Sequence, residues 1–470
     1  MSEQKRQFDL AIIGAGPGGY VAAIRAAHSG KSVALIEDKE LGGICLNWGC
    51  IPTKTLLAGA DVLRKVKMAK EFGVNVDHFH VDFPAMLRRK TQVVERIRKS
   101  LEGLLLSHKI HILRGFGQFR SKNEIIIKGD ETYAIQAEKT IIATGSRPRN
   151  LSAFPFDYHK IHDSSSIMEL ATLPNKMVIV GGGVIGCEFA SLFKELGVDV
   201  VVLEALPMIL SLEGKNVSDA MTSSFKKRGI AVHTNVAVKS IDTHGDGVVV
   251  HMGDDLAPIS ADIALVAVGR QFNNENIGLE KIGVAMHPAG FIDVDDHLQT
   301  NVPGIYAIGD ITGKMLLAHL ASHQGIIAAQ NAIGIDSVIH YNAVPSVIFT
   351  HPEVGTVGLT LEKAQEKGYD ATIGKFPFQA LGKSQASMET EGFAQVVVEK
   401  RSGQILGAQV VGHEAATLIA EMAVAIQNEL TLDCITETIH AHPTVSEAWL
   451  EASLIASDTP IHFPPKIRRS

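Results

Sequence analysis

The sequence predicts an α/β protein in which one strand–turn–helix unit occurs twice and a separate α+β region follows. A glycine-rich turn follows a short apolar strand at two places in the chain. Beyond Val344 the pattern changes to alternating strands with an amphipathic helix and no such turn. The composition, with 46% hydrophobic and 20% charged residues and 43 glycines, is typical of an α/β protein, and 470 residues suffice for about three domains of ~150 residues.

The first unit lies near the start of the chain. Phe8–Ile13 is an apolar strand, Gly14–Gly19 a glycine turn and Tyr20–His28 a helical pattern, and the next strand, Ser32–Ile36, ends at Glu37. In a Rossmann-like unit, glycines bring the backbone close to a pyrophosphate, the helix N-terminus faces it, and the acid binds the ribose hydroxyls. We therefore interpret the unit as a dinucleotide site, with a purely structural glycine turn as the alternative.

Two of the four cysteines lie together in the segment Gly42–Lys54. In an ideal helix the Cα atoms of Cys45 and Cys50 would be about 8 to 9 Å apart, beyond the roughly 7 Å limit for a disulfide, so we expect a departure from a single helix. Gly49 permits a tight turn, Pro52 suits the first turn of a helix starting near Ile51, and the N-terminus of that helix would stabilise a Cys50 thiolate. Because nothing upstream resembles a secretory signal, the pair is interpreted as catalytic or metal-binding; two small buried residues are the alternative.

The second unit repeats the first. Met177–Val180 is the strand, Gly181–Gly186 the turn and Cys187–Leu196 the helix, and the strand Val200–Leu203 ends at Glu204. In both units the acid follows the first glycine by 23 residues, a spacing that two accidental turns would rarely share. We predict two dinucleotide sites, and two such sites beside a dithiol suggest a relay between flavin, thiol and nicotinamide.

Other segments are expected to connect and complete these units. Val81–Leu106 reads as a helix whose many Arg and Lys side chains are solvated. Strand Lys139–Ile142 and the segment Val266–Arg270 each close a unit. Gly304–Asp310 is an apolar strand whose final carboxylate is placed to bind cofactor hydroxyls or to cap a helix, and Leu316–Ile333 is a helical pattern.

The C-terminal region combines predicted strands, Gln395–Val398 and Ile405–Val411, with an amphipathic helix, Ala415–Gln427. Near its end His442 precedes Glu447 by five residues, and a helix follows. A base with a carboxylate orienter is the functional interpretation of this spacing. A histidine packed near a helix cap is the alternative.

Charge and hydropathy exclude several classes. The net charge of −7 is mild and the only basic run is the short Lys-Ile-Arg-Arg end, so no nucleic-acid surface is indicated. Glu204, Pro207 and Glu421 interrupt the longest apolar stretches, which leaves no membrane span. Because Met1–Gln7 has neither a signal core nor a transit-peptide character, we expect a cytoplasmic protein.

Taken together, these motifs resemble the flavin disulfide reductases, and within that family the members that reoxidise protein-bound dihydrolipoamide with NAD. The resemblance extends end to end, and its most specific parts are the segments Gly43–Lys54 and His440–Glu447. It implies an FAD-binding domain (1–149), an NAD-binding domain (150–270), a central domain completing the FAD fold (271–343) and a C-terminal dimerisation domain (344–470). It also implies a homodimer. Its partner would be the lipoyl-bearing acyltransferase of a 2-oxo acid dehydrogenase complex, the glycine cleavage lipoyl protein, or both.

The resemblance further implies roles for single residues. Cys45 would exchange with the dithiol substrate, Cys50 would face the flavin, and His442 would be the acid/base with Glu447 as its orienter. His440 would be structural, and no metal ligand is expected. Lys54 and Glu188 would form an ion pair beside the flavin. The remaining cofactor positions implied are Gly14, Gly16, Gly19, Glu37, Gly115, Thr144, Gly145, Ser146, Asp310, Leu317, Ala318 and His319, and, for the NAD site, Gly181, Gly183, Gly186, Glu204, Val238 and Gly269.

Three positions depart from the common family pattern. Gln324 stands where glutamate is usual, Phe272 where proline is usual, and Phe349 where tyrosine is usual. None touches the dithiol, so they bear on local cofactor contacts and leave the reaction class unchanged.

Three rival functions were weighed. An NADPH-dependent relative such as glutathione reductase is disfavoured because Glu204 would repel a 2′-phosphate and no Arg or Lys occurs in residues 205–214. Mercuric reductase is disfavoured because a resemblance to it would call for a cysteine pair near the C-terminus, and no cysteine follows Cys434. A zinc-stabilised binding protein would use Cys45, Cys50, His440 and His442, but it leaves both glycine units unexplained.

Overall fold

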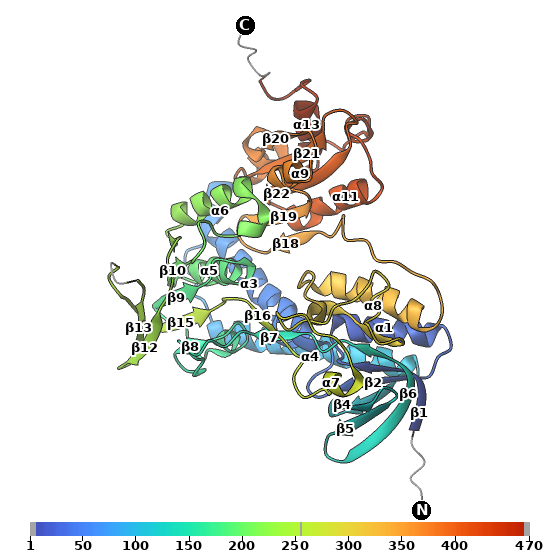
Figure 1. The fold of residues 1–470 in the computed structure, drawn as a ribbon. Coiled ribbons are helices and arrows are strands. Elements are labelled where there is room, and N and C mark those ends of the chain that lie inside the picture. Colours follow the sequence, from blue (N-terminus) through green and yellow to red (C-terminus); the bar gives the residue numbers. More distant parts are fainter. Residues whose placement is uncertain (1–5, 254–255, 465–470) are drawn as a thin grey trace, which may run out of the picture.

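A computed structural model gives the fold of residues 6–253 and 256–464 (Figure 1). The chain forms three bodies, and Figure 1 shows the first sheet and the C-terminal sheet at opposite ends of the molecule. The expectations for residues 1–5 and for the basic end, 466–469, lie outside the described residues. None of the helices in the described ranges has the length and apolar character that a membrane crossing needs.

The first sheet has seven strands and carries the first glycine turn. Its order is β3-β2-β1-β6-β5-β4, and β17 pairs in parallel with β6. Because β17 and helix α8 come late in the chain, this part returns to the first sheet, where α8 packs on α1. The elements are β1 (Arg6–Ile13), α1 (Pro17–His28), β2 (Val33–Glu37), β3 (His111–Arg114), β4 (Phe116–Ser121), β5 (Glu124–Lys128), β6 (Thr132–Ile142), β17 (Ile305–Ala307) and α8 (Ala318–Ala332).

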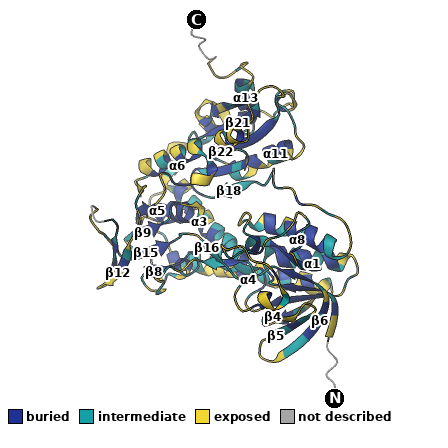
Figure 2. Ribbon diagram, in the orientation of Figure 1, coloured by how far each residue is buried: buried dark blue, intermediate teal, exposed yellow. Residues whose placement is uncertain are grey.

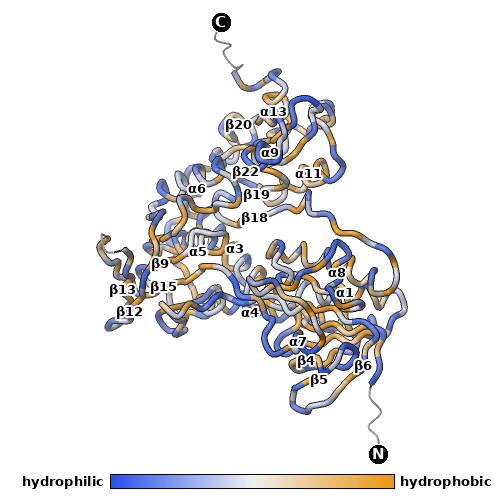
Figure 3. Tube along the Cα trace, in the orientation of Figure 1, coloured by the Kyte–Doolittle hydropathy of each residue, from blue (hydrophilic) through white to orange (hydrophobic). Residues whose placement is uncertain are grey.

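The second sheet is parallel and carries the second glycine turn, with the order β11-β10-β9-β15-β8. Its central strands β9 and β15 are hydrophobic (Figure 3) and buried (Figure 2), because the sheet is covered on both faces. A small antiparallel sheet, β12-β13-β14, lies beside it, and the pair β7–β16 links it to the first body. The elements are β7 (Ser146–Pro148), β8 (Ile161–His162), β9 (Lys176–Val180), α5 (Val184–Glu195), β10 (Asp199–Leu203), α6 (Lys215–Lys227), β11 (Ala231–His233), β12 (Ser240–His244), β13 (Gly247–His251), β14 (Ile259–Ala261), β15 (Ile263–Val266) and β16 (Arg270–Phe272). The short helix α7 (Leu279–Ile282) follows and packs on β4 of the first sheet.

The predicted strands and helices of both units are confirmed, with one shared difference. Helices α1 and α5 begin three residues earlier than expected, at Pro17 and Val184, because the last glycines of each turn already belong to the helix. A Cβ on Gly19 would lie 1.9 Å from the carbonyl oxygen of Gly14, and one on Gly186 would lie 2.0 Å from that of Gly181. These glycines therefore allow each helix to pack directly on its own turn.

The C-terminal sheet is antiparallel, with the order β18-β19-β22-β21-β20. Helix α11 packs on β19 and β22, and α13 packs on β20 and β21. Trp449 is fully buried between them and donates its indole N–H to the carbonyl oxygen of Leu418 at 3.1 Å. The elements are β18 (Ser346–Ile348), β19 (Glu353–Gly358), α9 (Leu361–Glu366), β20 (Ala371–Pro377), α10 (Gly382–Ser387), β21 (Phe393–Glu399), β22 (Ile405–Gly412), α11 (Ala415–Gln427), α12 (Leu432–Thr436) and α13 (Glu447–Ala456).

Two long helices, α3 (Cys50–Met68) and α4 (Phe83–Ser107), pack against each other and connect β2 to β3. The predicted helix at 81–106 is thus confirmed, and Asp82 caps it by accepting the amide of Ala85 at 2.9 Å. The expectation that its basic side chains are all solvated is wrong for Lys90. Its ammonium is buried and donates to the carbonyl oxygen of Met168 at 2.9 Å, because α4 packs against a segment distant in sequence.

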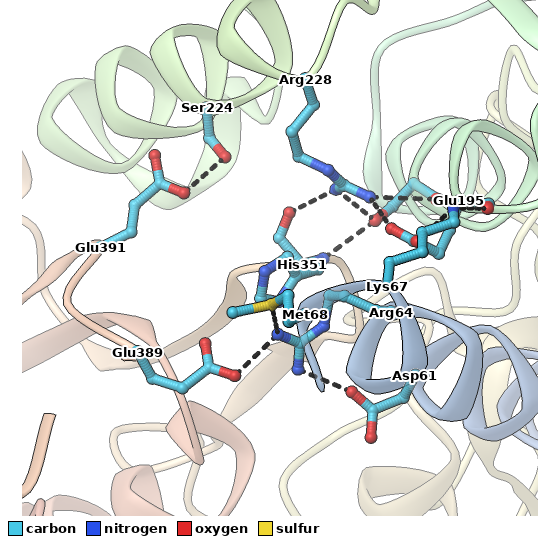
Figure 4. A network of polar contacts seen from close by, with 11 residues as sticks. Asp61, Arg64, Lys67, Met68, Glu195, Ser224, Arg228, His351, Glu389 and Glu391 are labelled. Carbon is cyan, nitrogen blue, oxygen red and sulfur yellow. Dashed lines mark hydrogen bonds and ion pairs between the residues drawn. The ribbon is translucent and has the colours of Figure 1, made fainter. Parts of the chain in front are cut away.

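A polar junction holds α3 to the other two bodies (Figure 4). The Arg64 guanidinium, only 11% exposed, pairs with Asp61 on its own helix and with Glu389 of the C-terminal body, both at 2.7 Å. Lys67 of α3 pairs with Glu195 of the second body at 2.8 Å, and Arg228 of the second body donates to the carbonyl oxygen of His351 in the C-terminal body at 2.6 Å. The junction fixes the orientation of the helix whose first residue is Cys50.

Candidate active site

The cysteine pair lies where one short helix ends and a long helix begins. α2 (Gly43–Trp48) carries Cys45, α3 starts at Cys50, and Gly49 between them has φ −142° and ψ −106°, which is not helical. A Cβ on Gly49 would come within 3.0 Å of the carbonyl oxygen of Ile44, so the turn is tight. The expected departure from a single helix is confirmed, although α2 itself was not predicted.

The two thiols are electrostatically unequal. A hydrogen bond from the Cys45 thiol, helped by the charge of Lys54, lowers the pKa of Cys50 to about 7, even though burial opposes this. The same hydrogen bond, together with burial, raises the pKa of the Cys45 thiol well above its usual range. Cys50 is therefore the thiolate and Cys45 the proton donor of the reduced pair. This asymmetry agrees in direction with the roles expected for them.

Lys54 and Glu188 form the ion pair that was expected. The Lys54 ammonium lies 2.8 Å from both carboxylate oxygens of Glu188, which also accepts the amide of Phe349 at 2.9 Å. The Phe349 ring lies 4.4 Å from the same ammonium, so the phenyl group that replaces the usual tyrosine contacts the cation through its face. The pair joins α3, which starts at Cys50, to α5, the helix of the second glycine unit.

The first glycine turn is shaped around a buried carboxylate. Glu37 accepts the amide of Ala15 at 2.7 Å and that of Lys39 at 2.9 Å, and burial raises its pKa to about 7. A Cβ on Gly14 would lie 2.3 Å from the carbonyl oxygen of Ala143, whereas the nearest atom to one on Gly16 would be 4.0 Å away. Position 14 thus has no room for a side chain, because the backbone at Ala143 lies too close, whereas Gly16 leaves open space above the turn.

The second turn repeats this geometry. Glu204 accepts the amide of Gly182 at 2.6 Å and that of Leu206 at 2.7 Å. A Cβ on Gly181 would lie 2.4 Å from the carbonyl oxygen of Ala267, and no atom lies within 4 Å of one on Gly183. Both predicted acids therefore bind their own glycine turns. Of the other positions expected here, Val238 is partly buried beside the second sheet and Gly269 has a φ of +105° with open space at its Cβ.

A polar cluster lies where the chain crosses between the first two bodies. Ser146 donates its hydroxyl to Asp310, and Arg270 donates to the Ser146 hydroxyl at 2.7 Å and lies 3.7 Å from Asp310. The buried hydroxyl of Thr144 has no hydrogen-bond partner among the described residues. Gly145, with φ +68°, has open space at its Cβ. Asp310 therefore faces Arg270, which the sequence pattern did not mark as a site residue.

Three further predicted positions lie around the first turn. Gly115 has φ +138° and donates its amide to the carbonyl oxygen of Glu37 at 2.9 Å. Leu317 is the N-cap of α8, whose first residues include Ala318 and His319, and the His319 Nε2 lies 2.7 Å from the carbonyl oxygen of Pro345. The Ser322 hydroxyl reaches the carbonyl oxygen of Pro17 at 3.4 Å, so the N-termini of α8 and α1 are adjacent.

Two of the residues that depart from the family pattern, Gln324 and Phe272, make specific contacts with neighbouring side chains or backbone groups. Gln324 is fully buried, accepts the amide of Gly309 at 2.6 Å through Oε1, and donates to the hydroxyl of Tyr341 at 3.1 Å. An amide can make both bonds, whereas an ionised carboxylate could only accept. Phe272 packs edge-to-face on Phe291, with ring centroids 5.9 Å apart.

His442 and Glu447 form a pair in the C-terminal body. The His442 Nδ1 lies 2.9 Å from one oxygen of Glu447, and the other oxygen accepts the amide of Thr444 at 2.8 Å. Burial would raise the pKa of Glu447, but these two hydrogen bonds lower it on balance. Because a carboxylate only accepts, the Nδ1 carries a proton and Nε2 is left as the basic nitrogen.

His442 is not joined to the thiols within one chain. Its side chain is 75% exposed, and no hydrogen bond or ion pair connects it to Cys45 in the described part of the chain. The described residues also contain no cluster of three or more His, Cys, Asp or Glu side chains suited to a metal.

The sequence matches known families over most of its length. The model of the pyridine nucleotide-disulphide oxidoreductases matches residues 8–325, and that of their dimerisation domain matches residues 344–453. The chain is 51% identical to a dihydrolipoyl dehydrogenase of Chlamydia pneumoniae, covering 98% of this chain and 99% of that protein. It is 40% identical to one of Geobacillus stearothermophilus, covering 97% of each.

Solved structures of other proteins have the same fold as this chain. The crystal structure of LpdA from Mycobacterium tuberculosis has a TM-score of 0.90 at 28% identity, covering 95% of this chain and 99% of that one. The HOCl-induced flavoprotein disulfide reductase RclA from Escherichia coli has a TM-score of 0.84 at 28% identity with the same coverage.

Proposed function

Because this chain belongs to the dihydrolipoyl dehydrogenases of the pyridine nucleotide-disulphide oxidoreductase family, we propose that it reoxidises protein-bound dihydrolipoamide through Cys45, Cys50 and His442. It is an NAD-dependent flavoprotein oxidoreductase, with FAD and NAD as its cofactors. The observation that carries the proposed residue roles is the unequal thiol pair at the start of α3, next to an ion pair that joins α3 to the helix of the second glycine unit.

The residues around both turns fit these cofactors. For FAD, the open space above Gly16, the carboxylate of Glu37 and the unpartnered hydroxyl of Thr144 would hold the pyrophosphate and a ribose, with Asp310 nearby. For NAD, the open space at Gly183 and the carboxylate of Glu204 would do the same. Bound beside Cys50, FAD supplies two-electron chemistry that links the thiol pair to NAD.

The side chains of the protein provide the thiol exchange. In the oxidised enzyme Cys45 and Cys50 are bonded to each other, and His442 Nε2 takes the proton of one substrate thiol. That thiolate attacks the Cys45 sulfur, forming a mixed disulfide and releasing Cys50 as the thiolate that its pKa of about 7 favours. The second substrate thiol, after losing its proton, displaces Cys45, so the substrate leaves as a cyclic disulfide and Cys45 is protonated.

We further propose that two subunits share each site, with His442 acting on the Cys45 of a second copy. The matched dimerisation domain supports a homodimer, and His442 is exposed on that domain. The nearby side chain of Ile439 is 96% exposed, which is unusual for a large apolar residue and is suited to burial against a second copy.

A mixed dimer tests the shared site. Cys45→Ser subunits and His442→Gln subunits should each be inactive alone, because one lacks the exchanging sulfur and the other the base. In a heterodimer purified with two different tags, one site carries both lesions and the other carries none, so activity should return to about half of the wild-type value. If His442 serves its own chain, every site keeps a lesion and no activity returns.

The remaining parts of the proposal concern organisation and setting. We divide the chain into FAD-binding (1–149), NAD-binding (150–270), central (271–343) and dimerisation (344–470) domains, a division supported by the return of β17 and α8 to the first sheet. The physiological substrate would be a lipoyl group on an acyltransferase or on a glycine cleavage protein. The two cysteines outside the redox pair, Cys187 and Cys434, have no disulfide partner, which supports a cytoplasmic setting.

A further inference from the structure

The described residues of the C-terminal body contain four histidine–carboxylate pairs: His413–Glu414, His440–Glu421, His442–Glu447 and His462–Glu451. In the His440 pair no ring nitrogen is left free. His440 uses both ring nitrogens, with Nδ1 lying 2.9 Å from the carbonyl oxygen of Thr438 and Nε2 lying 3.1 Å from Glu421. Its side chain is only 5% exposed. It therefore has neither a free nitrogen nor access to solvent, which agrees with a structural role.

The pair formed by His462 and Glu451 instead reproduces the geometry of His442 and Glu447. The His462 Nδ1 lies 2.7 Å from one oxygen of Glu451, and the other oxygen accepts the backbone amide of His462 at 3.2 Å. In both pairs one carboxylate oxygen meets Nδ1 and the other meets a backbone amide. The side chain of His462 is 72% exposed, and its Nε2 has no partner among the described residues.

The two pairs are neighbours on α13. Glu447 and Glu451 are four residues apart on the helix, so their Cβ atoms are about 6 Å apart on one face. Burial raises the pKa of Glu447, and the Thr444 amide and His442 lower it. The charge of His462 lowers it further, by a smaller amount. The segment that carries His462 is held in place, because the Phe463 ring packs edge-to-face on Phe376 of β20, with centroids 6.3 Å apart.

The reaction leaves one proton that has to reach solvent. A dithiol and NAD⁺ give a disulfide, NADH and one H⁺: two protons and two electrons leave the substrate thiols, and one proton with both electrons ends on the nicotinamide. In the proposed function His442 takes the proton of the first substrate thiol, and the second proton ends on Cys45. A second subunit would cover His442. An acceptor next to His442 would return its Nε2 to the basic form before the next thiol binds.

We propose that His462, oriented by Glu451, is the proton-relay residue that carries the surplus proton from His442 to solvent. Its free Nε2 accepts the proton through a short chain of water, and its exposed edge releases it. Buried Glu451, with a side chain only 4% exposed, keeps the ring in the required tautomer just as Glu447 does for His442. This role rests on the proposed function of His442.

The test replaces His462 with glutamine, whose amide can still donate to Glu451 but cannot take up a proton at neutral pH. Oxidation of reduced lipoamide by NAD⁺ is measured in dilute buffer, then with increasing imidazole. We expect kcat to fall about tenfold in dilute buffer with the KM for NAD⁺ unchanged, to recover with imidazole, and to show a larger solvent isotope effect. The matched control is His251→Gln, which alters another surface pair, 3.1 Å from Asp242 on the second body, and should change nothing.

The outcomes separate the two levels of the proposal. A wild-type protein without this activity, or an active His442→Gln variant, would overturn the proposed function itself. If those behave as expected, a His462→Gln variant with wild-type kcat in dilute buffer overturns the relay, and so does a loss that imidazole does not restore. Should the glutamine variant fail to bind FAD, His462→Asn is judged by the same criteria.

Discussion

Replacing Lys54 with methionine should make Cys50 a weaker acid. Both residues lie on α3 four positions apart, so their side chains start about 6 Å from each other. Unit charges at that distance and an effective dielectric constant of about 20 interact with about 2.8 kcal/mol, equivalent to about two pH units. Because Lys54 is 30% exposed and shares its charge with Glu188 at 2.8 Å, about one pH unit is the expected rise.

The assay uses the colour of a thiolate beside oxidised FAD, which gives a long-wavelength absorption band. In Cys45→Ser the new hydroxyl still donates to Cys50, so the band should titrate near pH 7, the pKa that the hydrogen bond from position 45, helped by Lys54, gives Cys50. Adding Lys54→Met should move this midpoint up by about one pH unit. Cys50→Ser should show no band, because only Cys50 is expected to face the flavin.

The matched control should shift the titration midpoint of Cys50 in the opposite direction. The charge of Glu188 raises the pKa of Cys50, so Glu188→Gln in the same background should lower the midpoint. A midpoint that stays within about 0.3 pH units in Lys54→Met, or that moves in the same direction in both variants, would show that the ion pair does not set the acidity of Cys50.

Two other predictions concern cofactor choice and acid stability. Glu204→Ser combined with Leu206→Arg should raise the ratio of kcat/KM for NADP over NAD at least about tenfold, because repulsion of a 2′-phosphate is removed and a partner supplied; an unchanged ratio would separate the second unit from nicotinamide binding. Burial, together with the charges of Arg64 and Arg228, lowers the pKa of His351 to about 3, below the ~6.5 of an unfolded histidine. The stability that neutral His351 contributes is therefore complete above pH ~6.5 and is lost as the pH falls toward 3, by at most about 1.4 kcal/mol per pH unit. His351→Asn should therefore flatten the fall of the thermal midpoint between pH 6.5 and 5, whereas replacing the exposed His244 should not, and an equal slope in both would refute this.

Much of the fold and part of the site followed from the sequence because those features are local. Gly14, Gly19 and Glu37 are brought together by one strand–turn–helix segment, so their spacing alone places them. The break at Gly49 followed in the same way from the distance that five helical residues would impose.

The parts that sequence could not reveal depend on contacts between distant segments. Arg270 reaches Ser146 and Asp310, which come from three separate stretches of the chain, and the only signal was that Arg270 follows the glycine that closes the second unit. Lys90 is buried because Met168 lies against α4 in the folded chain. His462 gave no signal, since its partner Glu451 is eleven residues earlier and the chain has to fold back to join them.

The two glycine turns differ in how deeply their acids are buried, and this difference bears on the proposed assignment of FAD to the first turn and NAD to the second. Glu37 is 8% exposed, and the strand that ends at Glu37 is completely buried beneath the crossing chain at Gly115. Glu204 makes the same pair of amide contacts but is only half-buried, and Leu206, which supplies one of those amides, is 51% exposed. A cofactor that stays through many turnovers gains from a buried ribose contact, whereas one that exchanges each turnover needs an open path to solvent. The difference arises from what packs over each acid, and it supports our proposal that the first unit holds a resident nucleotide and the second a diffusing one.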